Sequence, residues 1–333
     1  MTAPVRRDAP SVERLVRLAA RDMAEVDVLV RERMDSPVAV IPALAEHLIA
    51  AGGKRLRPLL TVAAARMSGD TGEACLKLAA SVEFIHTATL LHDDVVDGSQ
   101  RRRGKVAAHL IWGQASSVLV GDFLFARAFE LMVETDSLRA LDILARASRI
   151  IAEGEVQQLT RAHDLALPET VYMEIIAAKT AALFAAAAEA GAVASGAPEA
   201  RVAALHAYGH NLGLAFQLAD DALDYGGASD VLGKDAGDDF REGKATLPLI
   251  LAVARTGAAQ AAFWERTIGQ RQQSAEDFLC ARTLVLESGA IEATLDRAQG
   301  CAEAAKRALA VFPASEWRSA LEDLADFAVI RAA

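Results

Sequence analysis

The sequence contains few aromatic residues. Phe, Trp and Tyr make up only 5% of the 333 residues, although hydrophobic residues make up 53%. Alanine supplies much of this apolar content; it has the highest intrinsic helix propensity and lets helices pack closely. The composition therefore predicts an all-α protein.

The sequence also lacks an excess of positive charge. It carries 35 Lys and Arg residues against 45 Asp and Glu residues, which gives a net charge of −10. Proteins that bind nucleic acid need basic surfaces to meet the phosphate backbone. This charge balance argues against nucleic acid as the main partner.

Cysteine is scarce as well. The three cysteines, Cys75, Cys280 and Cys301, are scattered along the chain and show no metal-ligand spacing. We expect free thiols in a reducing cytoplasm rather than disulfides or a metal site.

Long apolar runs and a secretory signal are not apparent. Residues 1–10 lack an apolar core and are expected to form a flexible tail. Stretches without charged residues, such as 106–121 and 203–219, contain His, Asn or Gln and stop short of the ~20 apolar residues that span a bilayer. We therefore expect a soluble, cytoplasmic protein.

Helical periodicity dominates the chain, and no convincing run of alternating strand residues is present. No linker rich in Pro or Ser divides the chain, so we expect one all-helical domain spanning residues 1–333. The longest loop is expected at 226–243, which is too long and too charged for a plain connection. Helices are expected at 11–33, 58–67, 72–97, 115–134, 137–161, 169–195, 199–225 and 247–254, with several more towards the C-terminus.

Two acidic clusters carry the strongest chemical signal. Asp93, Asp94 and Asp97 follow one apolar helical stretch, and Asp220, Asp221 and Asp224 repeat the same DDxxD spacing after another. Residues four apart share one face of a helix, where like charges repel unless a cation bridges them. Carboxylate oxygens suit Mg²⁺, which fills its other positions with water and substrate phosphates. The alternative is that each cluster caps a helix or faces solvent, which is harder to maintain for two clusters than for one.

Basic residues stand beside these acids. Lys54 and Arg57 lie near an expected helix start, where free backbone N–H groups also favour anions. The run Arg101–Arg103 follows the first cluster, and Lys234 and Lys244 flank an acidic pair after the second. Such cations suit diphosphate groups. The alternative interpretation is that each basic run, taken alone, simply faces solvent.

The chain contains the motifs GGKRLRP (52–58), LHDDVVD (91–97), RRG (102–104), GDFL (121–124), KT (179–180), FQLADDALD (216–224) and GKDAGDDFREGKATL (233–247). Together these motifs resemble the trans-polyprenyl diphosphate synthases, in that family's order. The resemblance implies one all-α domain with helices around a deep central cavity, and a homodimer. It implies isopentenyl diphosphate and an allylic diphosphate as substrates, with a lipid product that brings the protein transiently to a membrane surface.

The resemblance also implies roles for the acidic residues. Asp93, Asp97 and Asp220 would bind Mg²⁺ directly, with three ions in each active site. Asp94, Asp221 and Asp224 would hold metal-bound waters.

Further roles follow for the other motif residues. Gln217 and the Thr180 hydroxyl would lie near the allylic carbons, although Gln217 and His86 could equally be helix-packing residues. The allylic diphosphate would contact Arg102, Lys179 and Lys234, with Lys244 as a further substrate-binding residue, and isopentenyl diphosphate would contact Lys54, Arg57, His86 and Arg103.

Ala88 and Thr89, one turn before Asp93, are predicted to set the length of the product. Short-chain members of the family carry aromatic residues at these positions. Because space in a close-packed interior exists only where side chains are small, this pair predicts about eight to ten isoprene units, as in quinone tails. The alternative is that both residues merely allow close helix packing, with a cavity floor set elsewhere. Floor candidates are Phe123, Phe125, Phe129 and Met132.

Three other functions compete with this interpretation. A shorter-chain, geranylgeranyl-type synthase would share every motif. A terpene cyclase would share the acidic clusters but would not need Lys54, Arg57, His86 and Arg103. A non-catalytic regulatory subunit would be expected to lose one acidic cluster, whereas this chain keeps both.

Overall fold

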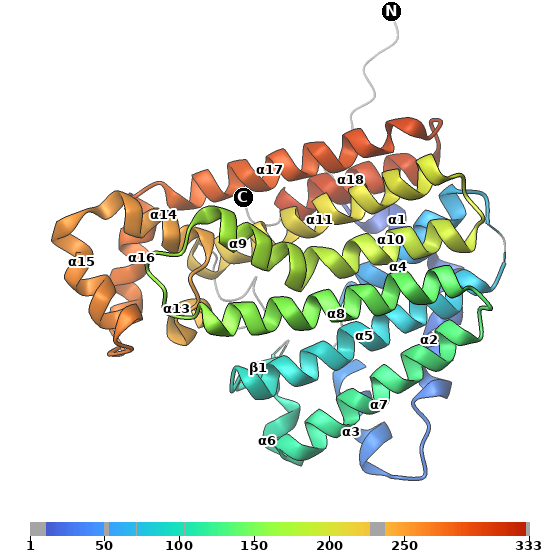
Figure 1. The fold of residues 1–333 in the computed structure, drawn as a ribbon, viewed down its shortest axis with the longest axis horizontal. Coiled ribbons are helices and arrows are strands. Elements are labelled where there is room, and N and C mark those ends of the chain that lie inside the picture. Colours follow the sequence, from blue (N-terminus) through green and yellow to red (C-terminus); the bar gives the residue numbers. More distant parts are fainter. Residues whose placement is uncertain (1–10, 50–52, 71, 103, 227–236, 331–333) are drawn as a thin grey trace, which may run out of the picture.

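The computed structural model describes residues 11–49, 53–70, 72–102, 104–226 and 237–330. It is helical almost throughout, which confirms the predicted all-α class (Figure 1). The helices are α1 (Glu13–Leu18), α2 (Ala20–Arg33), α3 (Val40–Ile49), α4 (Leu56–Met67), α5 (Ala74–Val96), α6 (Ala108–Trp112), α7 (Gln114–Val133), α8 (Leu138–Thr160), α9 (Glu169–Ile176), α10 (Ala182–Ala194), α11 (Glu199–Gly226), α13 (Asp238–Glu242), α14 (Leu247–Thr256), α15 (Ala258–Trp264), α16 (Asp277–Glu287), α17 (Ala290–Ala308) and α18 (Glu316–Ile330).

Small residues bring the central helices close together. A Cβ atom on Gly191 of α10 would lie 2.2 Å from the carbonyl oxygen of Thr61 on α4. A Cβ atom on Gly209 of α11 would lie 2.3 Å from the carbonyl oxygen of Phe184 on α10. These positions exclude any side chain, so α10 packs directly against its two neighbours.

The predicted helix over 169–195 contains a turn of π-helix. Between α9 and α10, residues Ala177–Ala181 (η1) form a π-helical turn that includes Lys179 and Thr180. One extra residue in a turn changes the direction of the side chains around it, and such turns are frequent at functional sites. A further π-helical turn, η2 (Glu265–Gly269), follows α15, and a 3₁₀ turn, η3 (Leu309–Val311), follows α17.

A short β-hairpin follows α5, where the sequence showed no strand pattern. β1 (Arg101–Arg102) pairs antiparallel with β2 (Lys105–Val106), and Arg102 is opposite Lys105. Two residues per strand are too few to produce a visible alternation in the sequence. The hairpin returns the chain towards the C-terminal end of α5.

The C-terminal part of the chain forms a second apolar cluster. Trp264, Phe240 and Tyr225 are fully buried in it, among residues of α11, α13, α14, α16 and α17. α17 and α18 also pack along α11, as Figure 1 shows. Within the predicted loop 226–243, the described part contains the short helix α13.

Two segments, α5 and Glu169–Ala194, are long and apolar enough to cross a membrane by length and composition alone. Most of each segment is buried among other helices of the protein. Burial of this kind is typical of core helices, and their apolar character is explained by the interior that they form.

Candidate active site

The first acidic cluster lies at the C-terminal end of α5. Asp93 and Asp94 belong to its last turn, and the backbone N–H of Asp97 donates to the Asp93 carbonyl oxygen at 2.8 Å. This end of a helix carries partial negative charge, which disfavours carboxylates there. The cluster therefore depends on cations beside it.

Two cations of the protein meet this need in part. Nε of Arg102, on β1, donates to Oδ1 of Asp94 at 2.8 Å. Nζ of Lys244 lies 2.7 Å from Oδ2 of Asp97 and 2.6 Å from Oε2 of Glu242. Burial alone would lower the pKa of Lys244, but Asp97 and Glu242 hold this pKa above its usual value. Lys244 therefore stays charged and joins the first cluster to the segment after the second.

The surroundings of Asp93 disfavour a charged carboxylate. Burial raises the pKa of Asp93 to about 7; attraction by Lys179 opposes this rise, and repulsion from Glu155 and Asp97 adds to it. A buried carboxylate repelled by its neighbours is stabilised by a bound cation.

The second acidic cluster lies near the C-terminal end of α11. Asp221 and Asp224 are buried, and Asp220 is partly buried. Oδ2 of Asp224 accepts the backbone N–H of Asp239 at 3.2 Å. The Asp224 carbonyl oxygen accepts the backbone N–H of Gly237 at 3.0 Å. Asp224 therefore fastens the start of α13 to α11.

Asp221 bonds to two side chains of the protein. The Tyr172 hydroxyl donates to Oδ2 at 2.6 Å, and Nε2 of Gln217 donates to Oδ1 at 2.7 Å. Burial, followed by repulsion from Asp239, raises the pKa of Asp221 to about 8. The predicted role of Asp94, Asp221 and Asp224 in holding metal-bound waters stays a prediction, since each already contacts a protein group.

These carboxylates fit a divalent cation shared with a substrate. Within the described ranges, no three His, Cys, Asp or Glu side chains are grouped closely enough to hold an ion by themselves. Mg²⁺ is usually bound through one or two carboxylates plus water and phosphate oxygens, and it prefers oxygen ligands. Oδ2 of Asp94 is buried and has no hydrogen-bond partner in the described part of the chain. The donor set therefore suits a metal–diphosphate complex better than a closed protein cage.

The predicted isopentenyl diphosphate residues lie near the start of α4. Nη1 of Arg57 is 3.1 Å from Nε2 of His86, on α5. A guanidinium can only donate, so Nε2 of His86 accepts this hydrogen bond. Lys54 is exposed, with Nζ 4.1 Å from the centre of the Phe327 ring. Arg103 and Lys234, the other predicted diphosphate contacts, lie outside the described residues.

The π-helical turn η1 positions Lys179 and Thr180. Nζ of Lys179 donates to Oε2 of Glu155 at 2.8 Å and to Oε1 of Gln158 at 2.9 Å, both on α8. The Thr180 hydroxyl donates to Oε1 of Gln217 at 2.7 Å. Two motifs that are 37 residues apart in the sequence thus meet through one hydrogen bond.

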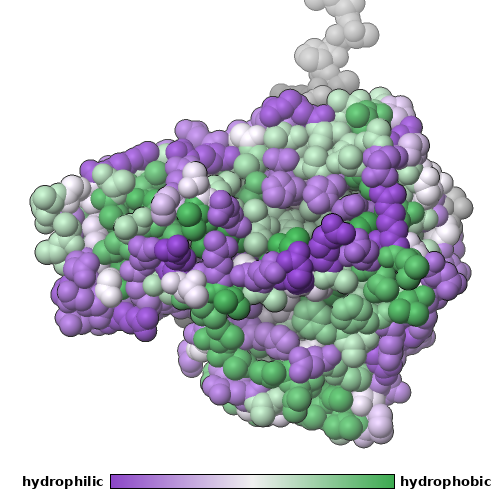
Figure 2. Space-filling view, in the orientation of Figure 1, coloured by the Kyte–Doolittle hydropathy of each residue, from purple (hydrophilic) through white to green (hydrophobic). Residues whose placement is uncertain are grey.

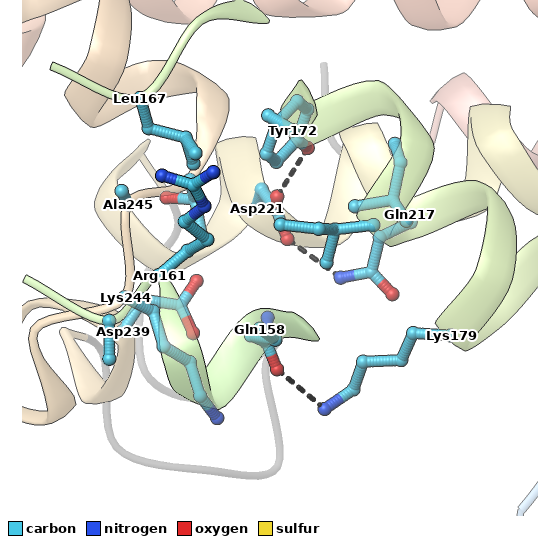
Figure 3. A pocket seen from close by; sticks show the side chains of 14 residues that line it. Gln158, Arg161, Leu167, Tyr172, Lys179, Gln217, Asp221, Asp239, Lys244 and Ala245 are labelled. Carbon is cyan, nitrogen blue, oxygen red and sulfur yellow. Dashed lines mark hydrogen bonds between the residues drawn. The ribbon is translucent and has the colours of Figure 1, made fainter. Parts of the chain in front are cut away.

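A cavity joins several of these side chains, as Figure 3 shows. Lys179, Gln217, Asp221 and Lys244 all line it, so parts of three sequence motifs face one space. Tyr172 and Gln217 both point towards Asp221 in this view. The other lining residues are Gln158, Arg161, Ala162, Leu167, Tyr172, Ile175, Ile176, Asp239, Ala245 and Thr246.

Polar residues of this site that were not predicted from the sequence include Glu155, Gln158 and Tyr172. Glu155 and Gln158 lie three residues apart on one face of α8 and both bond to Lys179. Tyr172 precedes Lys179 by seven residues, which is two helical turns. Spacing from Lys179 could have indicated Tyr172, but nothing local in the sequence shows that α8 faces Lys179.

The predicted chain-length residues lie on α5 before Asp93. Ala88 is fully buried, and the Thr89 hydroxyl donates to the His86 carbonyl oxygen at 2.8 Å. Neither residue lines the cavity described above. Of the floor candidates, Met132 is fully buried and Phe123 and Phe125 are partly buried. Phe129 is 41% exposed, and its place in the cavity floor stays a prediction.

Comparison with known proteins identifies relatives over nearly the whole length. The model of the family described as polyprenyl synthetase matches residues 38–285. The chain is 43% identical over 328 residues to an octaprenyl diphosphate synthase of Haemophilus influenzae, covering 98% of this chain and 99% of the relative.

Solved structures give the same result. One is a polyprenyl synthase from Caulobacter crescentus complexed with calcium and isoprenyl diphosphate, with a TM-score of 0.96, 71% identity, and coverage of 98% of this chain and 100% of that one. Another is a decaprenyl diphosphate synthase from Rhodobacter capsulatus, with a TM-score of 0.91, 53% identity, and coverage of 97% and 100%. The chain belongs to the polyprenyl synthetase family of prenyltransferases, which is the family that its sequence motifs resemble.

Proposed function

We propose that this enzyme extends an allylic diphosphate, farnesyl diphosphate in the first instance, by repeated 1′-4 condensation with isopentenyl diphosphate. The product is a trans-polyprenyl diphosphate of about eight to ten isoprene units, destined for a quinone side chain. The observation that carries the proposal is the full-length similarity to an octaprenyl diphosphate synthase, combined with both acidic clusters.

The residues of the site support this reaction. Asp93, Asp97 and Asp220 would hold Mg²⁺, with three ions per site, and the bound metal would stabilise negative charge on the departing diphosphate. Lys179 and Arg102 would hold the same diphosphate. Oxygen atoms of Gln217 and Thr180 would face the allylic carbon as its bond to diphosphate breaks.

Bond formation then needs little further chemistry from the protein. The isopentenyl double bond attacks the allylic carbon, and a proton leaves to the released diphosphate. Arg57 and His86 would orient isopentenyl diphosphate for this attack, together with Lys54 and Arg103. Apolar walls would keep water from the allylic cation.

A chelator experiment tests the metal requirement. Incorporation of labelled isopentenyl diphosphate should stop when the divalent cations are removed and should return when Mg²⁺ is added. Retained activity after complete chelation would contradict the proposed metal site.

Two rival functions are disfavoured by residues of the chain. A terpene cyclase has no need for the Arg57–His86 pair beside the acidic clusters. A silent regulatory subunit would not need to keep both clusters and the Lys179–Thr180 pair. A shorter-chain synthase shares the whole site, so product length alone separates it from the proposal.

The two groups of cations should separate by substrate. Arg57→Ala or His86→Ala should mainly raise KM for isopentenyl diphosphate, whereas Lys179→Ala or Lys234→Ala should mainly affect the allylic substrate. Loss of one hydrogen bond to a charged group costs about 1.5–3 kcal/mol, or roughly ten- to a hundredfold in binding. Steady-state kinetics with each substrate varied in turn measures this.

The control is Arg146→Ala, since the Arg146 side chain is 62% exposed on α8 and forms an ion pair with Asp142 on the same helix. Its two KM values should match those of the wild type. Equal effects of Arg57→Ala and Lys179→Ala on both substrates would show that the division of cations is wrong.

We also propose that the enzyme is a homodimer that associates through α6 and α7. Figure 2 shows hydrophobic residues gathered over the region where Figure 1 places these helices. Contiguous exposed apolar surface is typical of an interface. The exposed apolar side chains there are Leu110, Ile111, Val118, Leu119, Phe129 and Val133.

Substitution of one of these residues tests the dimer. Leu119 is 66% exposed. The substitution Leu119→Asp should weaken self-association, because it would bury a charge in the interface. Leu279→Asp on α16 is the control, since Leu279 is 63% exposed and lies on another part of the molecule. Sedimentation should show a dimer for the wild type and Leu279→Asp and a shift to monomer for Leu119→Asp; a wild-type monomer would contradict the proposal.

Three predictions about the chain's setting complete the proposal. The protein acts as one helical domain, it works in the cytoplasm, and it contacts a membrane surface transiently to release its lipid product.

A further inference from the structure

Four side chains, three of which line the cavity, form a continuous network of hydrogen bonds. The Tyr172 hydroxyl donates to Oδ2 of Asp221 at 2.6 Å, and Nε2 of Gln217 donates to Oδ1 of the same carboxylate at 2.7 Å. The Thr180 hydroxyl donates to Oε1 of Gln217 at 2.7 Å. Figure 3 shows the first two of these bonds on the wall of the cavity.

The hydrogen bonds of this network run in a fixed direction from donor to acceptor, which follows from what each group can donate. An amide side chain can be turned by 180° with little change in shape, so its orientation is decided by its partners. Asp221 accepts from both of its neighbours, and this requires the NH₂ group of Gln217 to face Asp221. Oε1 of Gln217 must then face the other way, towards Thr180.

The Thr180 hydroxyl is fixed in turn. Its single hydrogen is directed to Gln217, so its oxygen can still accept but cannot donate a second hydrogen bond. Thr180 is 6% exposed, Asp221 3% and Tyr172 2%, so solvent offers few competing partners. In a buried network, each polar group depends on its assigned partner.

The hydrogen-bond network also spans the π-helical turn. Tyr172 belongs to α9, before the turn, and Thr180 belongs to η1 itself. Both connect to α11 through Asp221 and Gln217. The network therefore holds the irregular turn at a fixed distance from the second acidic cluster.

We propose that Tyr172 is a positioning residue, which acts through Asp221 and Gln217 to orient Thr180 towards the reacting allylic carbon. The inference rests on the proposed function, because the group that needs orientation is the allylic substrate. Tyr172 itself need not touch the substrate. Asp221 gains a second role beside any contact with metal-bound water.

The test is Tyr172→Phe, which keeps the buried ring and removes only the hydroxyl. Misdirected oxygen atoms act on the reaction step more than on binding, so we expect kcat to fall about tenfold while KM for both substrates stays within about twofold. The control is Tyr208→Phe, since Tyr208 is also fully buried and its hydroxyl donates to the Leu321 carbonyl oxygen at 2.7 Å, outside the site. Its kcat should be unchanged.

A double substitution distinguishes positioning from a general loss of packing. Gln217→Leu removes the link between Asp221 and Thr180, so adding Tyr172→Phe to this variant should lower kcat no further. An equal additional loss in both backgrounds would overturn the proposal, because Tyr172 would then act by another route. An unchanged kcat in Tyr172→Phe would overturn it as well.

A second variant keeps the test decisive if Tyr172→Phe folds poorly. Para-aminophenylalanine at position 172 supplies an N–H donor in place of the hydroxyl, and it should restore most of the kcat lost with phenylalanine. Failure of this rescue in a folded enzyme would contradict the proposal. Absence of wild-type synthase activity would instead contradict the proposed function, so the two failures are distinguishable.

Discussion

Asp93→Ala and Asp220→Ala are each expected to lower the rate of isopentenyl diphosphate incorporation by about three orders of magnitude, since metal-assisted stabilisation of a leaving group contributes several kcal/mol. Asp93 lies at the negative end of α5 and is repelled by Glu155 and Asp97. Without metal, its removal relieves that repulsion. The Asp93→Ala protein should therefore fold at least as stably as the wild type in the absence of Mg²⁺.

This combination of lost activity and retained stability is the useful result. Truncation of a residue that only supports the fold would lower the stability of the protein. The residues of a ligand site, in contrast, often destabilise the protein when the ligand is absent. Thermal unfolding without Mg²⁺ and steady-state rates with Mg²⁺ measure the two effects.

The matched control is Asp142→Ala on α8. Asp142 is 62% exposed and pairs with Arg146, which is one helical turn away. Its rate and stability should both stay close to those of the wild type. A near-normal rate for Asp93→Ala or Asp220→Ala would remove the metal-site interpretation of that cluster.

Ala88→Phe should shift the main product to about three to four isoprene units, because an aromatic ring would occupy space that only a small side chain leaves open. Ala88 is fully buried on α5, one turn before Asp93. The first condensations should continue, since the diphosphate-binding residues are unchanged. Product chromatography after reaction with labelled isopentenyl diphosphate measures the change.

Overpacking must be separated from a change in product length. Adding volume to a packed core costs about 1–3 kcal/mol, so circular dichroism must first show that the variant is folded. Ala88→Val serves as an intermediate, with an expected product between those of the wild type and Ala88→Phe. An unchanged long product from folded Ala88→Phe would place the elongation path elsewhere, while the synthase assignment would stand.

Much of the helical fold could be predicted because local signals mark helix ends. The predicted helix over 115–134 corresponds to Gln114–Val133, and that over 199–225 to Glu199–Gly226. Flanking Gly and Pro residues and a steady helical period account for this agreement. The predicted helix over 11–33 divides instead at Ala19, which separates α1 from α2.

The features that escaped prediction depend on tertiary contacts. The π-helical turn at Lys179 adds one residue to a turn without any local sequence signal. The hairpin at Arg101–Arg102 is too short for a strand pattern, and its place is tied to the ion pair between Arg102 and Asp94. Tyr172 is apolar enough to resemble any core residue until the fold brings its hydroxyl to Asp221.

The sequence also predicted the charged residues of the site without their partners. Arg102, Lys179 and Lys244 were each expected to contact substrate diphosphate. In the structure they bond to Asp94, Glu155 and Asp97, respectively. Carboxylates of the protein thus partly neutralise the cations that were expected to bind anions. These pairs depend on the spatial arrangement of α5, α8 and the segment before α14, which the sequence alone does not show.

The most direct test of the account is the length of the wild-type product. The enzyme would be supplied with farnesyl diphosphate, labelled isopentenyl diphosphate and Mg²⁺, and the chain length would be determined by chromatography. We expect products of about eight to ten isoprene units and none after chelation of Mg²⁺. A main product of about four units would contradict the long-chain assignment, and no elongation at all would contradict the synthase itself.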